Sequence, residues 1–115
     1  MFQTNFSLMY WNVSGIYSSI AGDKISKFDD EYLFKLALSH DIVCLVETHL
    51  NKDDKFSLEG YKVTNFKRPK SSNERKASGG ISVALKDSIR EGVKFLGSRK
   101  NCTEYTWLRL SKDFF

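Results

Sequence analysis

The chain has 115 residues, of which 41% are hydrophobic, 14% are aromatic and one is a proline. This composition excludes a disordered or fibrous protein, and the length leaves room for about one domain. The formal net charge is +4. No apolar run approaches the roughly 20 residues of a membrane-spanning helix, and the first residues lack the basic-then-apolar pattern of a secretory signal. We therefore expect an intracellular protein.

The first predicted strand is the aromatic-rich segment 6–11, which the polar, glycine-containing segment 12–15 interrupts. Strand geometry places Phe6, Leu8 and Tyr10 on one face.

A helix is predicted next. Ser26 followed by Asp29 resembles a capping box, which begins a helix. Apolar residues recur at helical spacing through this region, at Ile25, Phe28, Tyr32 and Leu36. We expect the helix to end at His40 and Asp41, with His40 capping it.

Further strands are predicted at 42–46, 61–66, 81–85, 93–96 and 105–110. Segment 42–46 is continuously apolar, which is typical of a strand covered on both faces. Gly79-Gly80 is expected to form the turn into segment 81–85, because no Gly-Lys-Ser/Thr phosphate-binding pattern follows it. The order strand, helix, then several strands predicts an α/β fold, with a mixed sheet and one main helix, in a single domain over 1–115.

Cysteines and tryptophans are interpreted as structural. Cys44 lies in an apolar strand and Cys102 in a polar stretch, so free thiols are expected rather than a disulfide. Trp11 and Trp107 are expected to lie in the core, because buried tryptophans are commoner than exposed stacking platforms.

Polar residues follow two of the apolar strands. Asn12 follows the first strand, and Glu47 directly follows segment 42–46. If these strands are parallel neighbours, both residues emerge at one edge of the sheet, where ligands of open α/β sheets gather. A carboxylate there can bind Mg²⁺, and an amide can orient a phosphate oxygen or a water. The alternative is that Glu47 is a solvated loop residue.

Segment 67–76 is strongly basic. It carries a single acid, Glu74, against five basic residues: Lys67, Arg68, Lys70, Arg75 and Lys76. Such a patch can attract phosphate backbones, and it is equally consistent with a solvated loop.

Several stretches together resemble the endonuclease/exonuclease/phosphatase superfamily, and are most similar to the endonuclease domains of non-LTR retrotransposon proteins. The matching stretches are YWNVSG at 10–15, DIVCLVET at 41–48, GGISV at 79–83 and WLRL at 107–110. The sequence ETHL at 47–50 and the ending 107–115 carry the retrotransposon likeness.

The resemblance implies a DNase I-like fold, a four-layered α/β sandwich of two facing sheets with helices outside. It also implies a Mg²⁺-dependent endonuclease that nicks DNA, with the nucleus as a candidate location. In the family, the first-motif asparagine positions the phosphate or attacking water, and the second-motif glutamate binds the metal. Those roles fall on Asn12 and Glu47, with Thr48 supporting Glu47.

The family pattern also requires a tyrosine in a later strand, a Gly-Asp-x-Asn motif and a terminal Ser-Asp-His, none of which occurs here. We therefore expect a partial domain, the N-terminal half, which is inactive alone. His49 is expected to face solvent rather than act as the base. An uncovered sheet face would favour self-association. The alternatives are a non-catalytic nucleic-acid-binding fragment that uses loop 67–76, or a phosphatase-type member of the superfamily.

Overall fold

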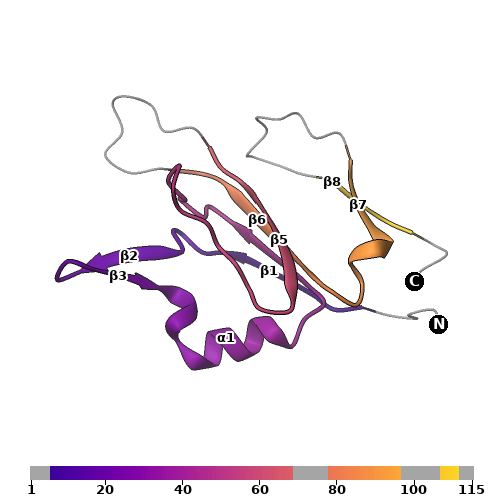
Figure 1. Cartoon of the computed structure of the whole chain (residues 1–115), viewed down its shortest axis with the longest axis horizontal. Helices are drawn as coiled ribbons and strands as arrows, with labels where there is room; N and C mark the ends of the chain where they lie inside the picture. Colours follow the sequence, from indigo (N-terminus) through magenta and orange to yellow (C-terminus); the bar gives the residue numbers. More distant parts are fainter. Residues whose placement is uncertain (1–5, 69–77, 97–106, 112–115) are drawn as a thin grey trace.

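The protein has a mixed α/β fold with one α-helix, a four-stranded mixed sheet and two small hairpins (Figure 1). It is known from a computed structural model, which describes residues 6–68, 78–96 and 107–111. The central sheet has the order β1-β4-β6-β5. Its strands are β1 (Leu8–Asn12), β4 (Ile42–Val46), β6 (Ile81–Lys86) and β5 (Tyr61–Phe66).

The pairing of β1 with β4 is parallel, as the sequence suggested. Leu8 lies opposite Ile42, and Asn12 lies opposite Val46. Both β4 and β5 pair with β6 in the antiparallel sense. The strand boundaries predicted at 42–46, 61–66 and 93–96 are therefore confirmed, and the run of antiparallel pairs after the helix is confirmed as well.

The connection from β1 to β4 contains a hairpin that the sequence reading missed. It consists of β2 (Tyr17–Ile20) and β3 (Asp23–Ser26), joined by Ala21 and Gly22. These two residues have φ values of +52° and +85°. A two-residue turn with both φ angles positive matches the right-handed twist of paired strands, which explains why this short loop closes a hairpin.

The predicted helix is present but shorter and differently capped. The capping box at Ser26 and Asp29 is confirmed, and it begins a 3₁₀ turn, η1 (Lys27–Asp29). A second cap follows, in which the Asp30 side chain accepts from the backbone N–H of Leu33 and begins α1 (Glu31–Leu38).

Because α1 is capped at Asp30, its apolar face differs from the predicted one. Tyr32 is 73% exposed, whereas Ala37 is buried and Phe34 and Leu38 pack on the core. Ile25 belongs to β3 rather than to the helix. The predicted inward position of Tyr32 is therefore wrong, because the register of α1 is set by Asp30 and not by Ser26.

One face of the central sheet is covered by α1, η1 and the loop between β4 and β5 (Figure 1). Its buried centre includes Val43 and Leu45 from β4 and Ala84 from β6. Trp11 packs here in edge-on contact with Phe28, at 6.1 Å between ring centroids, so its predicted structural role is confirmed.

The opposite face is covered on the β6 side by η2 (Arg90–Gly92) and by the hairpin of β7 (Val93–Leu96) and β8 (Trp107–Leu110). The buried side chains of Ile89, which precedes η2, and of Val93 in β7 pack with those of Ile81, Val83 and Leu85 of β6. Trp107 is 66% exposed, so the prediction that it lies in the core is wrong.

The β1 side of this second face is open. Leu8 is 55% exposed and Tyr10 is 66% exposed, and the partly exposed Phe6 precedes them. Cys44 and Val46 of β4 are half-buried. The uncovered apolar surface therefore lies mainly on β1, whereas β4 residues are packed into the hydrophobic clusters on both faces of the sheet. Cys44 is a free thiol, as predicted, and burial raises its pKa.

A tyrosine from β5 holds the end of α1. The Tyr61 hydroxyl lies 3.2 Å from the carbonyl oxygen of Leu38, and it also contacts the carbonyl oxygens of Ala37 and His40. The last carbonyls of a helix lack partners within the helix, and the single O–H of Tyr61 can donate to one of these three oxygens at a time. It ties the helix to the sheet that it covers.

Replacing Tyr61 with phenylalanine should therefore lower the free energy of unfolding by about 1 kcal/mol, the usual net value of one hydrogen bond. Urea denaturation measures the change. Tyr32→Phe removes the same hydroxyl at an exposed position of α1 and should leave the stability unchanged. Equal losses in the two variants would show that the contact with α1 contributes nothing.

Candidate functional site

The carboxyl ends of β1 and β4 meet at one edge of the sheet and bring Asn12 close to Glu47. Asn12 pairs with Val46, the residue before Glu47. The pairing continues past both strands, because the N–H of Val13 donates to Val46 and the N–H of Gly15 donates to Glu47, at 3.0 and 2.7 Å. The arrangement predicted for these two residues is thus the one observed.

Both side chains are accessible at this edge. Asn12 and Glu47 are exposed. The Asn12 side-chain oxygen accepts from the N–H of Ser14 at 3.1 Å, which closes a local turn and fixes the direction of the amide. The nitrogen end of the exposed Asn12 amide and the exposed Glu47 carboxylate remain accessible to a ligand.

The backbone at this edge adopts conformations that non-glycine residues rarely take. Ser14, Glu47 and His49 have φ values of +48°, +53° and +53°. Left-handed conformations of such residues carry a strain of roughly 1–2 kcal/mol each and persist only where surrounding contacts enforce them. At this edge, the strain lies on Glu47, a candidate ligand, and on Ser14 and His49, which follow Asn12 and Glu47 by two residues.

Thr48 lies between Glu47 and His49, the two residues with left-handed backbone, and backbone hydrogen bonds hold it in place. It is 1% exposed, its N–H donates to the carbonyl of Gly80, and its carbonyl accepts from Ile16 at 3.0 Å. Its hydroxyl has no hydrogen-bond partner among the described residues. Backbone bonds on both sides hold Thr48, and Glu47 is consequently held at the end of β4.

Gly79 and Gly80 form the turn into β6, as predicted, and they lie against this edge. The N–H of His49 donates to the carbonyl of Gly79 at 2.9 Å. Both glycines have positive φ, at +66° and +94°. A β-carbon at Gly80 would lie 2.6 Å from the Thr48 hydroxyl, so the close approach of the two segments requires glycine here.

A lysine satisfies the carbonyls at the end of β1. The Lys27 ammonium donates to the carbonyl of Val13 and lies 3.3 Å from that of Ser14. It also stands 5.9 Å from the centre of the Trp11 ring. Lys27 therefore anchors η1 to the strand end that carries Asn12.

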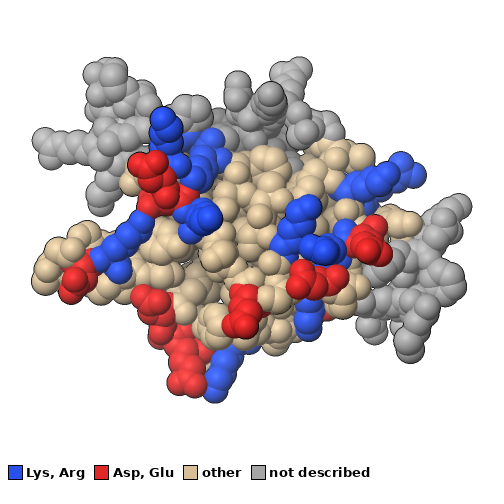
Figure 2. Space-filling view, viewed as in Figure 1, with Lys and Arg blue, Asp and Glu red and all other residues tan. Residues whose placement is uncertain are grey.

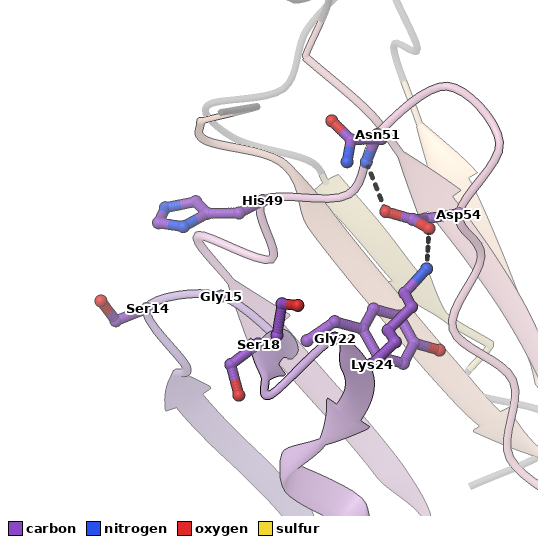
Figure 3. A pocket seen from close by; sticks show the side chains of 10 residues that line it. Ser14, Gly15, Ser18, Gly22, Lys24, His49, Asn51 and Asp54 are labelled. Atoms are coloured by element: carbon purple, nitrogen blue, oxygen red, sulfur yellow. Dashed lines mark hydrogen bonds and ion pairs between the residues drawn. The ribbon is translucent and has the colours of Figure 1, made fainter. Parts of the chain in front are cut away.

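A cavity of about 680 Å³ opens beside this edge, between the β2–β3 hairpin and the loop after β4 (Figure 3). Its lining residues are Ser14, Gly15, Tyr17, Ser18, Ser19, Gly22, Lys24, His49, Asn51 and Asp54. Ser14 and His49 lie two residues after Asn12 and Glu47, so the cavity adjoins the candidate site. Neither Asn12 nor Glu47 lines it.

An ion pair joins the two walls of the cavity. The Lys24 ammonium of β3 contacts the Asp54 carboxylate, which also accepts from the backbone N–H of Asn51 at 3.1 Å (Figure 3). The hydrogen bond from Lys24 lowers the pKa of Asp54. The Tyr17 hydroxyl donates to the carbonyl of Lys55 at 3.0 Å, which adds a second link, and burial raises the pKa of Tyr17.

His49 is half-buried on the wall of this cavity rather than fully in solvent. The prediction for it is therefore correct only in part, because the left-handed backbone at His49 turns its ring across Gly15, whose added β-carbon would lie 3.2 Å from Nδ1. His40 lies at the end of α1, where its Nδ1 is 2.8 Å from the carbonyl of Leu36, in agreement with the predicted capping role.

The predicted basic surface is described only in part. Lys67 is half-buried and bonds to the carbonyl of Lys52 at 2.9 Å, and Arg68 is exposed beside Gly79. Lys70, Arg75 and Lys76 lie outside the described residues, so nucleic-acid binding by this segment stays a prediction. On the face seen in Figure 2, the described lysines and arginines are interspersed with acids.

Among the described residues, the edge presents part of the donor set that a divalent cation needs. Within 6–68, 78–96 and 107–111, no cluster of three or more His, Cys, Asp or Glu residues occurs. The Glu47 carboxylate offers oxygen ligands of the type Mg²⁺ prefers, whereas the Asn12 side-chain oxygen accepts from Ser14 and its N–H groups can donate to a phosphate. This cation usually takes one or two protein carboxylates and completes its octahedron with waters and substrate phosphate. The two residues therefore fit part of such a site.

No family model, curated protein or solved structure matches this chain. No helix among the described residues is long and apolar enough to cross a membrane.

The sequence predicted Asn12, Glu47 and Thr48 as site residues, but it did not predict the cavity beside them. Two local features of the sequence correspond to the walls of this cavity. The segment YSSIAGDKIS has strand-like ends around Ala21-Gly22, and Asn51 is followed by Asp54 at the spacing of a capped turn. Neither signal indicates that the two segments face each other. That contact follows from the path of β1 and β4.

Proposed function

We propose that this chain contributes part of a divalent-cation-dependent phosphodiesterase site, the N-terminal half of a DNase I-like endonuclease domain. The observation that carries the proposal is the parallel pairing of β1 with β4, by which Asn12 and Glu47 share one edge. Glu47 holds the cation, Thr48 fixes Glu47, and Asn12 orients a phosphate oxygen or the attacking water.

The strained backbone at the same edge supports this proposal. Glu47, the proposed cation ligand, has a left-handed φ angle, as do Ser14 and His49 on the adjoining segments, and such strain concentrates at functional sites. A bound cation would supply Lewis-acid stabilisation of the charge that develops on the phosphate. The part played by this chain is to orient that phosphate and to hold the cation through one carboxylate.

The uncovered face of the central sheet at β1 supports a more specific proposal, that the complete domain is a four-layered sandwich. In such a sandwich, a second sheet covers the face on which Leu8 and Tyr10 are 55% and 66% exposed. A sheet face with exposed large apolar residues is a docking surface, either for further chain or for a second copy of this protein. Self-association through this face is thus part of the same proposal.

The test measures the effect of Mg²⁺ on DNA binding. Fluorescence anisotropy with a short duplex should show tighter binding in Mg²⁺ than in EDTA, and Glu47→Gln should remove this increase. Mg²⁺ competes with basic side chains for phosphates, so binding through lysine and arginine alone would weaken instead. Weaker binding in Mg²⁺, or an increase that Glu47→Gln leaves unchanged, would contradict the proposal.

A second test of the proposed function is a nicking assay on supercoiled plasmid, run beside the DNA-binding measurement. We expect no Mg²⁺-dependent nicking by this chain alone, because among the described residues the edge presents one carboxylate and one amide. Nicking that EDTA and Glu47→Ala both abolish would overturn this expectation, since the chain would then hold a complete site.

A further inference from the structure

The strand β1 is the outermost strand on one side of the central sheet, because the strand order is β1-β4-β6-β5 (Figure 1). Among the described strands it pairs only with β4, and its other side, which we call the outer side of β1, pairs with none. An outermost strand presents backbone N–H and C=O groups that can pair with a further strand. The outer side of β1 is therefore a candidate binding surface.

The hydrogen bonds at the two ends of β1 identify the backbone groups that point toward β4. The carbonyl of Ser7 accepts from the N–H of Ile42, and the N–H of Val13 donates to the carbonyl of Val46, each at 3.0 Å. In a regular parallel pair, every second residue directs both of its backbone groups to the neighbouring strand. The odd-numbered residues of this segment therefore bond to β4, and the even-numbered residues point away from it.

The even-numbered residues are Leu8, Tyr10 and Asn12, which direct their N–H and C=O groups to the outer side. Within 6–68, 78–96 and 107–111, these groups bond to no other backbone group. All three residues are exposed. The outer side of β1 thus carries a regular row of backbone donors and acceptors that is open to another strand.

The composition of β1 does not discourage such pairing. Its sequence, LMYWN, contains no charged residue, proline or glycine. The strand on the opposite side of the sheet, β5, carries the exposed Lys62. Lysine on an outermost strand is one of the features by which proteins prevent pairing with another strand. The two sides of the sheet therefore differ, and β1 is the side suited to association.

The row of groups on β1 is complementary to itself. In an antiparallel pair, the two residues of a hydrogen-bonded pair exchange both of their N–H···O bonds. When Tyr10 lies opposite the Tyr10 of a second copy, Leu8 lies opposite Asn12 and Asn12 opposite Leu8. Each outward N–H and C=O of one copy then meets a partner on the other. A register shifted by two residues would leave the groups of one of these residues unpaired, so the register centred on Tyr10 is favoured.

We propose that two copies of this chain pair in the antiparallel sense through the outer sides of β1, which joins their central sheets into one continuous sheet. A twofold axis passes between the two Tyr10 residues, whose rings lie on the same face beside Leu8. Aromatic and apolar neighbours across strands stabilise a pair of this kind. The inference rests on the self-association included in the proposed function, and it does not require the cation site at Asn12 and Glu47.

Sedimentation equilibrium over a series of protein concentrations measures the association. We expect an equilibrium between monomer and dimer without larger species, because a twofold pair uses the outer side of β1 in both copies and closes the assembly. A chain that is monomeric at every concentration would overturn the proposal and would leave the outer side of β1 to a strand of another kind.

Hydrogen exchange of the backbone amides, followed by NMR, locates the contact. The amides of Leu8, Tyr10 and Asn12 should exchange more slowly as the dimer forms, because their N–H groups become hydrogen-bonded. The amides of Met9 and Trp11 bond to β4 and should exchange slowly in monomer and dimer alike. A dimer in which exchange at Leu8, Tyr10 and Asn12 stays fast would associate through another surface, such as the face of the sheet, and would refute the pairing.

Tyr10→Lys tests the centre of the pair. It removes the aromatic contact and places like charges opposite each other, so dimerisation should weaken about tenfold. Tyr32→Lys is the matched control, because it makes the same change at a position of α1 that is 73% exposed, and it should leave the dimer affinity unchanged. Equal dimer affinities in the two variants would place the contact elsewhere.

Tyr10→Pro tests the backbone directly. Proline lacks the outward N–H, and its loss from both copies should weaken dimerisation about thirtyfold. The pairing of β1 with β4 should persist, because proline is tolerated on an outermost strand where the N–H points away from the sheet. Slow exchange at Met9 and Trp11 verifies that pairing. A folded Tyr10→Pro chain that dimerises like the wild type would contradict the proposal.

Glu47→Gln separates this inference from the cation site. The variant should dimerise like the wild type, and Tyr10→Lys should bind Mn²⁺ like the wild type. Dimerisation without cation binding would leave the β1 pairing standing and would remove the cation site. Cation binding by a chain that stays monomeric would do the reverse.

Discussion

Replacing Gly80 with alanine should lower the free energy of unfolding by about 2–5 kcal/mol. Gly80 has a φ of +94°, and a β-carbon there would lie 2.6 Å from the Thr48 hydroxyl and 3.3 Å from the carbonyl oxygen of Phe66. The left-handed conformation accounts for about 1–2 kcal/mol, and forcing an extra carbon into a filled site adds about 1–3 kcal/mol. Thr48 is 1% exposed and held by backbone bonds on both sides, so it cannot move aside.

Gly22→Ala is the matched control. Gly22 has a φ of +85°, similar to that of Gly80, but nothing lies within 4 Å of its added β-carbon. This variant isolates the conformational term and should lose only about 1 kcal/mol. Chemical denaturation of both variants separates backbone strain from the clash. Equal losses would show that the edge around Thr48 is not tightly packed.

A double variant tests whether the Thr48 hydroxyl causes the clash. Thr48→Ala removes that oxygen, so the loss caused by Gly80→Ala should be smaller in the Thr48→Ala background than in the wild type. The difference is the coupling free energy of a double-mutant cycle, expected to be about 1 kcal/mol or more. Additive losses would assign the clash to the Phe66 carbonyl instead.

Much of the fold follows from local pattern. The continuous apolar run 42–46 and the alternating run at 81–85 are recognisable because burial on one or both faces imposes those patterns on a strand. The parallel pairing of β1 with β4 also follows, since a helix between two strands favours a parallel crossover. These elements predict where Asn12 and Glu47 lie.

Other features depend on contacts that the sequence does not display. The inward face of α1 differs from the prediction because Asp30, rather than Ser26, caps that helix. Tyr32 consequently faces solvent at 73% exposure, and Trp107 does so at 66% because the β7–β8 hairpin turns it outward. The cavity requires the β2–β3 hairpin to face the loop after β4, which is a tertiary contact between short polar segments.

Glu47→Gln is expected to weaken binding of a divalent cation at the sheet edge by at least about tenfold. Within the described ranges, Glu47 is the carboxylate that extends β4 at this edge, and glutamine keeps its size while removing its charge. Loss of a supporting group around a metal site typically reduces affinity by roughly 10–100-fold, and loss of the charged ligand itself should do no less.

The control for this substitution is Glu59→Gln. Glu59 is also exposed, and it precedes β5, whose first residue Tyr61 pairs with Lys86. Val46 pairs with Ile81, at the other end of β6. Glu59 therefore lies at the end of the sheet away from Glu47, and its replacement should leave cation binding unchanged.

Titration with Mn²⁺, followed by paramagnetic broadening of backbone amide signals, tests the central claim most directly, because it detects weak binding and reports its position. We predict that the amides of Asn12, Ser14, Glu47 and Thr48 broaden first in the wild-type chain and in Glu59→Gln, and that Glu47→Gln abolishes this broadening at the same Mn²⁺ concentration. Broadening that begins elsewhere, or that persists unchanged in Glu47→Gln, would contradict the assignment of a cation site to this edge.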